Sequence, residues 1–217
     1  MNKNQSHLIW QGGLIFGFAS GLQMILGTII GLERLSEGEI LFIILSVLME
    51  ILIMGGATGL FWRMTPRRKD KWRFLIPLAA VTLLDLLLNL FILTRVGSGL
   101  TLWFVWFGVE IGFGLIRATL WGLVFGGCFG WVYQGREGIF GFAMAGITGK
   151  VLGFLVGQAS FIPIYKILSI QELPSLYINS HPWFALLMMP ATILGGLIFG
   201  AILGRKTDRA HPEVGVV

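Results

Sequence analysis

Long apolar stretches separated by short polar segments set the hydrophobic pattern of this chain. Six of them cover about residues 8–31, 40–62, 74–94, 99–133, 139–161 and 183–203. About 20 apolar residues in a helix, rising roughly 1.5 Å each, cross a hydrocarbon layer about 30 Å thick. The pattern therefore predicts an all-α fold, a polytopic integral membrane protein. Residues 1–217 are expected to form one transmembrane domain, a single bundle of about six helices packed through glycine-rich faces.

The fourth stretch is the longest, and it carries charges far from its ends. It holds one acid, Glu110, and one base, Arg117, between Trp103 and Trp131. A continuous helix would place these two tryptophans about 42 Å apart along its axis. Tryptophan is enriched at the two membrane interfaces, which lie roughly 40–45 Å apart. We therefore expect one long, tilted helix whose two charges fall within the hydrocarbon.

Lysine and arginine are unevenly distributed between the connecting segments. If the stretches alternate in direction, eleven Lys and Arg residues fall on the side of both termini and three on the other. Six of the eleven lie in Arg63–Arg73. Cytoplasmic loops carry an excess of basic residues, so both termini are predicted to be cytoplasmic, in the plasma membrane of a bacterium. Tryptophans near the ends of stretches are expected at the inner interface (Trp10, Trp62, Trp72, Trp131) and at the outer one (Trp103, Trp106, Trp183).

The longest connection, Ile162 to Pro182, is interrupted by Pro163, Pro174 and Pro182. Because proline removes a backbone donor and disturbs a helix, this segment is expected outside the bundle. Two interpretations stay open, a surface segment at the interface that forms an outer lid, and an irregular loop.

The composition agrees with a membrane protein and excludes several classes of function. The chain is 55% hydrophobic and 12% charged, with a mean hydropathy of +0.82, whereas soluble domains carry about 25% charged residues. The net charge of +5 lies mainly in loops, which argues against nucleic acid as a partner. The lone Cys128 excludes an internal disulfide, and all three histidines lie outside the stretches. No metal-ligand spacing such as H-E-x-x-H is present, so neither an enzyme nor a cofactor is predicted.

Glycines recur at a spacing of four. The phrase Gly-Leu-Ile/Val-Phe-Gly begins at Gly13, Gly122 and Gly196, and another glycine follows each copy four residues later. The fifth stretch adds Ala145, Gly149, Gly153 and Gly157. Positions four apart share a helix face, and small residues let helices approach closely in lipid. The pattern predicts a glycine zipper between the first, fourth, fifth and sixth stretches. Packing is favoured over a pore or sliding surface, and an inverted duplication is a weaker alternative.

Polar groups at membrane depth are the candidate functional residues. They comprise Glu50, Asp85, Asn89, Glu110, Arg117 and Lys150. A charged side chain at a helix centre costs about 2.5–3.5 kcal/mol on insertion scales, so these groups are expected to face the bundle interior or water. The expected partner of the acids is Lys150, and that of Arg117 is Glu50 or Asp85. Three acids against two bases leave one carboxyl that need not be ionised, as a proton-coupled carrier requires.

Two functions are compatible with these residues. The first is a small-solute transporter or a substrate-capturing membrane subunit, with the six polar residues as its binding or coupling site. The layout of six short-looped stretches with both ends inside is similar to the substrate-binding membrane subunits of energy-coupling-factor vitamin importers. That resemblance concerns the layout and transfers no site residue. The second function is a structural or assembly subunit that docks a partner membrane subunit through glycine faces, with charges that only fix helix register. Expected partners are thus the lipid bilayer, a small polar or charged solute, and a membrane subunit.

Overall fold

The computed structural model describes residues 5–33, 39–65, 72–95, 103–169 and 182–209. Within them the chain forms six α-helices. These are α1 (Gln5–Glu33), α2 (Glu39–Met64), α3 (Leu75–Arg95), α4 (Trp103–Gln134), α5 (Arg136–Ser169) and α7 (Pro182–Arg209). Three of them contain windows long and apolar enough to cross a membrane, namely Val47–Met64, Gly114–Gln134 and Arg136–Gly157. The helical class is confirmed, while six membrane crossings remain a prediction.

Helix boundaries differ from expectation chiefly at two places. Helix α5 continues through Pro163 to Ser169, so the surface segment expected from residue 162 is helical over its first part. Apolar residues on both sides of this proline favour continued helix, which membrane proteins tolerate where neighbouring groups satisfy the freed carbonyl. The remainder of that segment, residues 170–181, lies outside the described residues. Helix α7 extends to Arg209, and Lys206 and Arg209 in its last turn are favourable at the negative end of the helix dipole.

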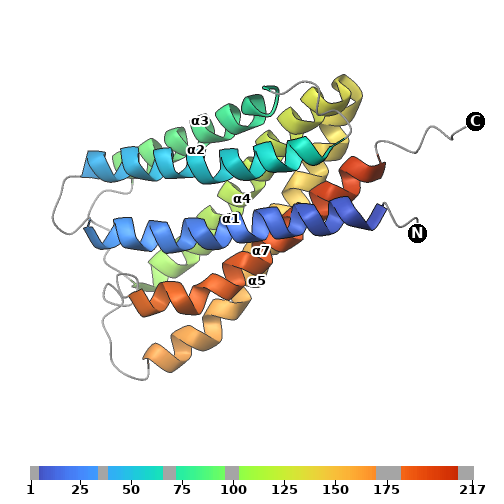
Figure 1. The fold of residues 1–217 in the computed structure, drawn as a ribbon. Coiled ribbons are helices and arrows are strands. Elements are labelled where there is room, and N and C mark those ends of the chain that lie inside the picture. The colour runs from blue at the N-terminus through green and yellow to red at the C-terminus, as the bar shows by residue number, and fades with distance from the viewer. Residues whose placement is uncertain (1–4, 34–38, 66–71, 96–102, 170–181, 210–217) are drawn as a thin grey trace, which may run out of the picture.

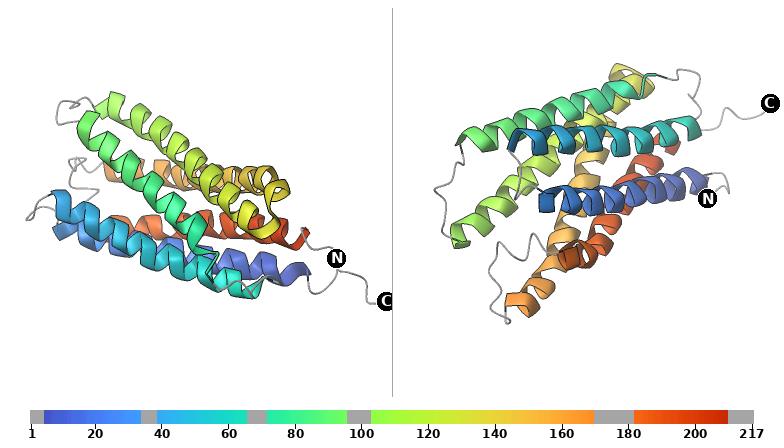
Figure 2. Two further views of the ribbon diagram at one scale, coloured as in Figure 1. Left: turned by 90° about the horizontal axis from the view of Figure 1, so that it is seen from above. Right: turned by 60° about the vertical axis from the view of Figure 1, so that its left-hand side comes forward.

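The six helices form a closed ring. Helix α1 contacts α2 and α7, α2 contacts α3, α3 contacts α4, α4 contacts α5, and α5 contacts α7. Successive helices run in opposite directions, so α1 begins and α7 ends at the same end of the bundle (Figures 1 and 2). We call this the termini end. Every helix therefore presents one face to a shared interior.

Glycines lie where neighbouring helices of the ring come closest. A Cβ atom added at Gly122 of α4 would lie 2.5 Å from the carbonyl oxygen of Gly146 on α5. A Cβ at Gly153 of α5 would lie 3.0 Å from the Cα of Gly195 on α7. A Cβ at Gly12 of α1 would meet the Gly200 carbonyl of α7 at 2.5 Å. Backbone approaches backbone at these points, which leaves no room for a side chain.

The turn between α4 and α5 depends on one glycine. Gly135 has φ = 76°, a left-handed conformation that costs glycine little and other residues more. Its amide donates to the Trp131 carbonyl at 2.8 Å, and the Gly138 amide donates to the Gly135 carbonyl at 3.1 Å. The chain thus reverses within one residue, which holds the two glycine faces of α4 and α5 together from the turn onward.

Aromatic rings fill the interior of the half nearer the termini end. Along α4 the rings of Trp121, Phe125, Phe129 and Tyr133 stack in succession, with centroid separations of 4.9, 6.1 and 5.8 Å. Other helices add the buried rings of Phe16, Phe61, Trp62, Phe142 and Phe199. We call these nine residues the aromatic core. Together with neighbouring aliphatic side chains these rings form a buried hydrophobic cluster.

The position predicted for Trp62 is wrong. Its ring is 1% exposed and packs edge-on against Phe129 and Tyr133, so it belongs to the aromatic core and not to an interface. The rings of Trp10, Trp72 and Trp131 are exposed, as an interfacial position requires. Trp62 differs because the rotation of α2 turns it toward α4, which its distance from the helix end does not reveal.

Candidate functional site

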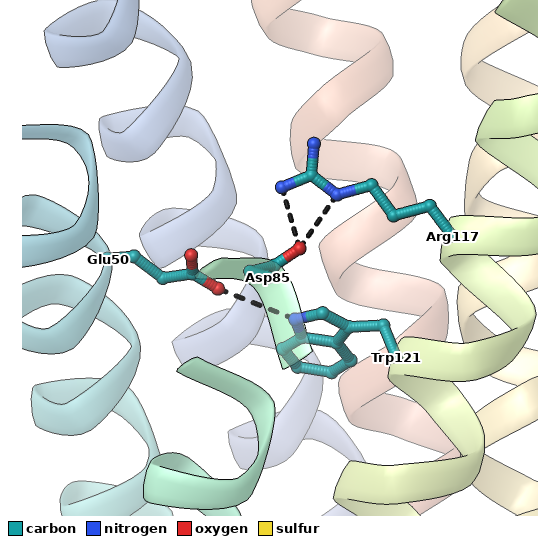
Figure 3. A network of polar contacts seen from close by, with 4 residues as sticks. All are labelled: Glu50, Asp85, Arg117 and Trp121. Carbon is teal, nitrogen blue, oxygen red and sulfur yellow. Dashed lines mark hydrogen bonds and ion pairs between the residues drawn. The ribbon is translucent and has the colours of Figure 1, made fainter. Parts of the chain in front are cut away.

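Four charged residues from four helices meet near the middle of the bundle. Glu50 comes from α2, Asp85 from α3, Arg117 from α4 and Lys150 from α5, each well inside its helix. Figure 3 shows Glu50 and Asp85 facing Arg117 across the interior, with Trp121 beside them. Each lies in a helix whose neighbouring residues are apolar, so the ring geometry and not local sequence brings them together. We call these four residues the charged cluster.

Asp85 and Arg117 form an ion pair between α3 and α4. The guanidinium Nε donates to Asp85 Oδ1 at 2.8 Å, and a terminal guanidinium nitrogen lies 2.7 Å from the same oxygen (Figure 3). The aspartate side chain is 2% exposed and that of the arginine is 41% exposed. Asp85 was one of the two partners expected for Arg117. Both contacts converge on one carboxylate oxygen, and the opposite edge of the guanidinium meets no acceptor among the side chains that the structure describes.

Glu50 has a weaker set of partners than Asp85. Its carboxyl group is buried beside that of Asp85, with Trp121 alongside (Figure 3). The Trp121 indole N–H donates to Glu50 Oε1 at 3.4 Å, near the upper limit for a hydrogen bond. Within the described part of the chain, no cation lies within ion-pair distance of Glu50. Two carboxyl groups therefore adjoin, and one guanidinium engages only one of them.

Lys150 rests on aromatic faces. Its ammonium nitrogen lies 3.5 Å from the centre of the Trp121 ring and 4.9 Å from that of Phe199. Such cation–π contacts contribute about 0.5–2 kcal/mol, more when the site is dry. Among residues whose side chains are described, none forms an ion pair with Lys150, although Glu50 and Asp85 are close enough to interact with its charge. The sequence predicted a carboxylate partner for Lys150, whereas among the described residues its ammonium contacts two ring faces and no carboxylate lies within ion-pair distance.

Trp121 links the two residues that lack an ion pair. Its indole N–H points at Glu50 while its ring face carries the Lys150 ammonium. Sequence reasoning missed Trp121 and Phe199 as parts of the site. The available signal was the aromatic spacing of four along α4, one residue before the glycines at 122, 126 and 130. This spacing places rings and glycines on adjacent faces, so that α4 meets α5 with one face and the interior with the other.

The remaining candidates are only partly described. Asn89 and Glu110 lie in α3 and α4, but their side chains fall outside the described residues. Thr82, one turn from Asp85, has a buried hydroxyl oxygen without a hydrogen-bond partner among the described residues, and so has Thr58, two turns from Glu50 on α2. Buried hydroxyls of this kind usually bind ordered water. The region around the two carboxyl groups is therefore polar enough to hold water as well as charge.

No family model matches this chain, and neither a curated protein nor a solved structure matches it. The chemistry of the charged cluster follows from its composition, two acids and two bases around an aromatic ring. Searching the described residues finds no group of three or more His, Cys, Asp or Glu side chains that would hold a metal ion. The cluster can bind ions and polar groups through its ammonium, its free guanidinium edge and its carboxyl oxygens.

Proposed function

We propose that this chain is a multi-pass membrane protein that transports or captures a small polar or charged solute. Its six helices cross the bilayer with both termini in the cytoplasm, and glycine faces hold them together. The solute binds at the charged cluster of Glu50, Asp85, Arg117 and Lys150. Asn89 and Glu110 extend the same polar faces of α3 and α4, so they belong to the proposed site.

One observation carries this proposal: the charged cluster is incompletely paired. Residues that only fix helix register are expected as closed ion pairs, because an unpaired charge at depth costs several kcal/mol. Asp85 and Arg117 fit that description. Lys150 and Glu50 do not, since each contacts Trp121 and neither reaches an opposite charge in the described residues. Lys150 and Glu50 are thus suited to bind a ligand that carries an opposite charge or a strong hydrogen-bonding group.

The position of the aromatic core supports access from one side. Among the aromatic-core rings on α4, Trp121 is the farthest from the termini end, and Arg117 lies one turn beyond it. From Trp121 to the termini end the interior is filled by buried rings. Arg117 is partly exposed, although it sits near the middle of its helix. We therefore propose that a solute reaches the cluster from the end opposite the termini, because buried rings fill the described interior on the termini side. The distribution of Lys and Arg predicts that this opposite end faces the outside.

A thermal-shift screen tests the proposal. The purified protein is heated with vitamins, amino acids and inorganic ions, and a bound solute raises the melting temperature. At a concentration 100 times its Kd, the solute adds about 2.7 kcal/mol to the free energy of unfolding. Lys150→Met should fold with a melting temperature near that of the wild type, because no ion pair is broken, and should lose the shift. Arg205→Met, on the exposed end of α7, is the matched control and should keep the shift. A Lys150→Met protein that fails to fold would contradict the proposal.

The rival hypothesis is a structural or assembly subunit. The closed Asp85–Arg117 pair favours it, because such a pair can hold α3 and α4 in register without any solute. The same screen separates the two functions. A structural role predicts that no solute stabilises the protein and that Lys150→Met lowers the melting temperature as strongly as a substitution in the aromatic core does.

A further inference from the structure

Glu50 is the charged-cluster residue with the fewest interactions that favour a negative charge. Its side chain is 7% exposed, so water solvates it poorly. Within the described residues the Trp121 indole donates to it at 3.4 Å, whereas Asp85 receives two guanidinium contacts under 3 Å. A buried carboxylate is stabilised by strong donors or a close cation, and Glu50 has neither at short range.

The charged groups that act on Glu50 come from α3, α4 and α5. Asp85 of α3 adds a like charge at close range, and Arg117 of α4 is engaged by Asp85. Lys150 of α5 acts on Glu50 only from a distance. Glu110 lies two turns before Arg117 on α4, and its side chain is outside the described residues. Helix α1 has no Asp, Glu, Lys or Arg between residues 8 and 32, and α7 has none between 182 and 204.

We propose that Glu50 is a proton-binding group and that its proton is taken up together with a small anion held by Lys150 and Arg117. This inference rests on the proposed solute-binding function. The step is an addition to a carboxylate oxygen: a proton from solvent forms the O–H bond of the Glu50 carboxylic acid, and no other bond breaks. The acid can then donate to the adjoining Asp85 carboxylate, which removes the repulsion between two negative charges.

Counting formal charges explains why proton and anion bind together. With both carboxyl groups ionised, the two acids and two bases of the charged cluster cancel. With Glu50 protonated, Asp85 still neutralises Arg117, and Lys150 remains as one uncompensated positive charge. The free guanidinium edge of Arg117 adds donors for a planar oxyanion such as a carboxylate. A small carboxylate or similar anion then restores neutrality inside the bundle, and by linkage each ligand strengthens the binding of the other.

Binding of small anions across a range of pH tests the linkage. The probes are formate, acetate, pyruvate, succinate and inorganic phosphate, measured by calorimetry with the purified protein in detergent. In the wild type the affinity should fall as pH rises, by up to about tenfold per pH unit for one linked proton. Glu50→Gln imitates the protonated side chain, so its affinity should be independent of pH. Glu137→Gln, at the exposed start of α5, is the matched control and should behave as the wild type. Equal pH dependence in Glu50→Gln and the wild type would overturn the proposal.

Infrared spectroscopy tests the proton without any solute. Wild-type protein containing ¹³C-labelled glutamate should show a carboxylic acid band that moves relative to unlabelled protein and disappears at alkaline pH. The band should be missing from Glu50→Gln, which distinguishes Glu50 from Glu110. Labelled aspartate should leave the band in place. A band that moves with aspartate, or no acid band at any pH, would overturn the assignment to Glu50.

The two measurements distinguish failure of this inference from failure of the proposed function. A glutamate acid band with no anion bound at any pH would contradict anion uptake and leave the protonation of Glu50 standing. Anion binding that does not depend on pH, with no acid band, would contradict protonation and leave the solute-binding function standing.

Discussion

Replacing Gly126 with alanine tests the contact between α4 and α5 at one of its closest points. The added Cβ would overlap the Phe142 carbonyl oxygen and lie 3.0 Å from the Cα of Ala143. Both neighbours are backbone atoms of α5, so no side chain can rotate away. The adjacent Gly127 is the matched control, because a Cβ there would meet only side-chain carbons of Ala143 and Ile139, at 3.9 Å.

The expected loss of stability follows from these distances. Carbon atoms in contact lie about 3.5–4.0 Å apart, so α4 and α5 would have to separate by roughly 0.5–1 Å. Overpacking of this size costs about 1–3 kcal/mol. The separation also loosens the neighbouring contacts of Gly122 and Gly130, which lie on the same face of α4. Alanine favours a helix over glycine by about 0.8–1.0 kcal/mol, and this gain is common to both variants.

Thermal unfolding of the purified variants in one detergent measures the difference. For a chain of this length about 1 kcal/mol shifts the melting temperature by roughly 2–4 °C, so Gly126→Ala should melt roughly 2–12 °C below Gly127→Ala. Gly127→Ala should match or slightly exceed the wild type. Equal melting temperatures for the two variants, or a lower value for Gly127→Ala, would refute close backbone contact at Gly126.

Three further predictions concern other parts of the bundle. Arg117→Met leaves the 2%-exposed Asp85 as an unpaired charge and should lower the free energy of unfolding by about 3–5 kcal/mol. Asp85→Asn leaves an arginine that is 41% exposed, so it should lower that free energy less. Equal drops in melting temperature for the two variants would contradict this asymmetry. Gly200→Ala places a Cβ against the backbone of α1 and should lower the melting temperature. The Cβ of Gly56→Ala meets nothing within 4 Å, so this control should melt like the wild type. A comparable loss of melting temperature in both variants would count against the contact. Phe129→Ala removes a ring with 0% exposure and should cost about 3–5 kcal/mol by thermal unfolding, with Phe129→Leu costing less; a loss below about 1 kcal/mol would show that the aromatic core does not hold the termini half together.

Pairing within the charged cluster was only partly predictable. A charge at the middle of an apolar helix must turn inward, which identified Glu50, Asp85, Arg117 and Lys150 as candidates to meet. The sequence left two acids open as partners of Arg117, and the structure selects Asp85. For Lys150 the described structure shows contact with the Trp121 face and no described carboxylate within ion-pair distance, while the side chain of Glu110 lies outside the described residues. Spacing along one helix says which residues share a face, but it carries no information on the rotation of the facing helix.

The same limit explains Trp62. Its place near the end of an apolar stretch fits a membrane interface, and Trp10, with a similar place in α1, is indeed exposed. The two tryptophans differ in orientation, because Trp62 lies on the face of α2 that packs against other helices and Trp10 lies on an exposed face of α1. Trp62 faces Phe129 and Tyr133 of α4, a contact between segments about seventy residues apart in the sequence.

Apolar length and periodicity alone predicted the helices, their number in the described chain and the charges at mid-helix, because a chain that crosses hydrocarbon is penalised for exposed backbone and charge at every position. Those constraints are local and can be read residue by residue. The order of helices around the ring, the aromatic filling of one half, and the unequal partners of Glu50 and Asp85 were decided by tertiary contacts. They depend on how far each helix rotates and approaches its neighbours, and that is set jointly by glycines and rings on different helices, not by any one stretch.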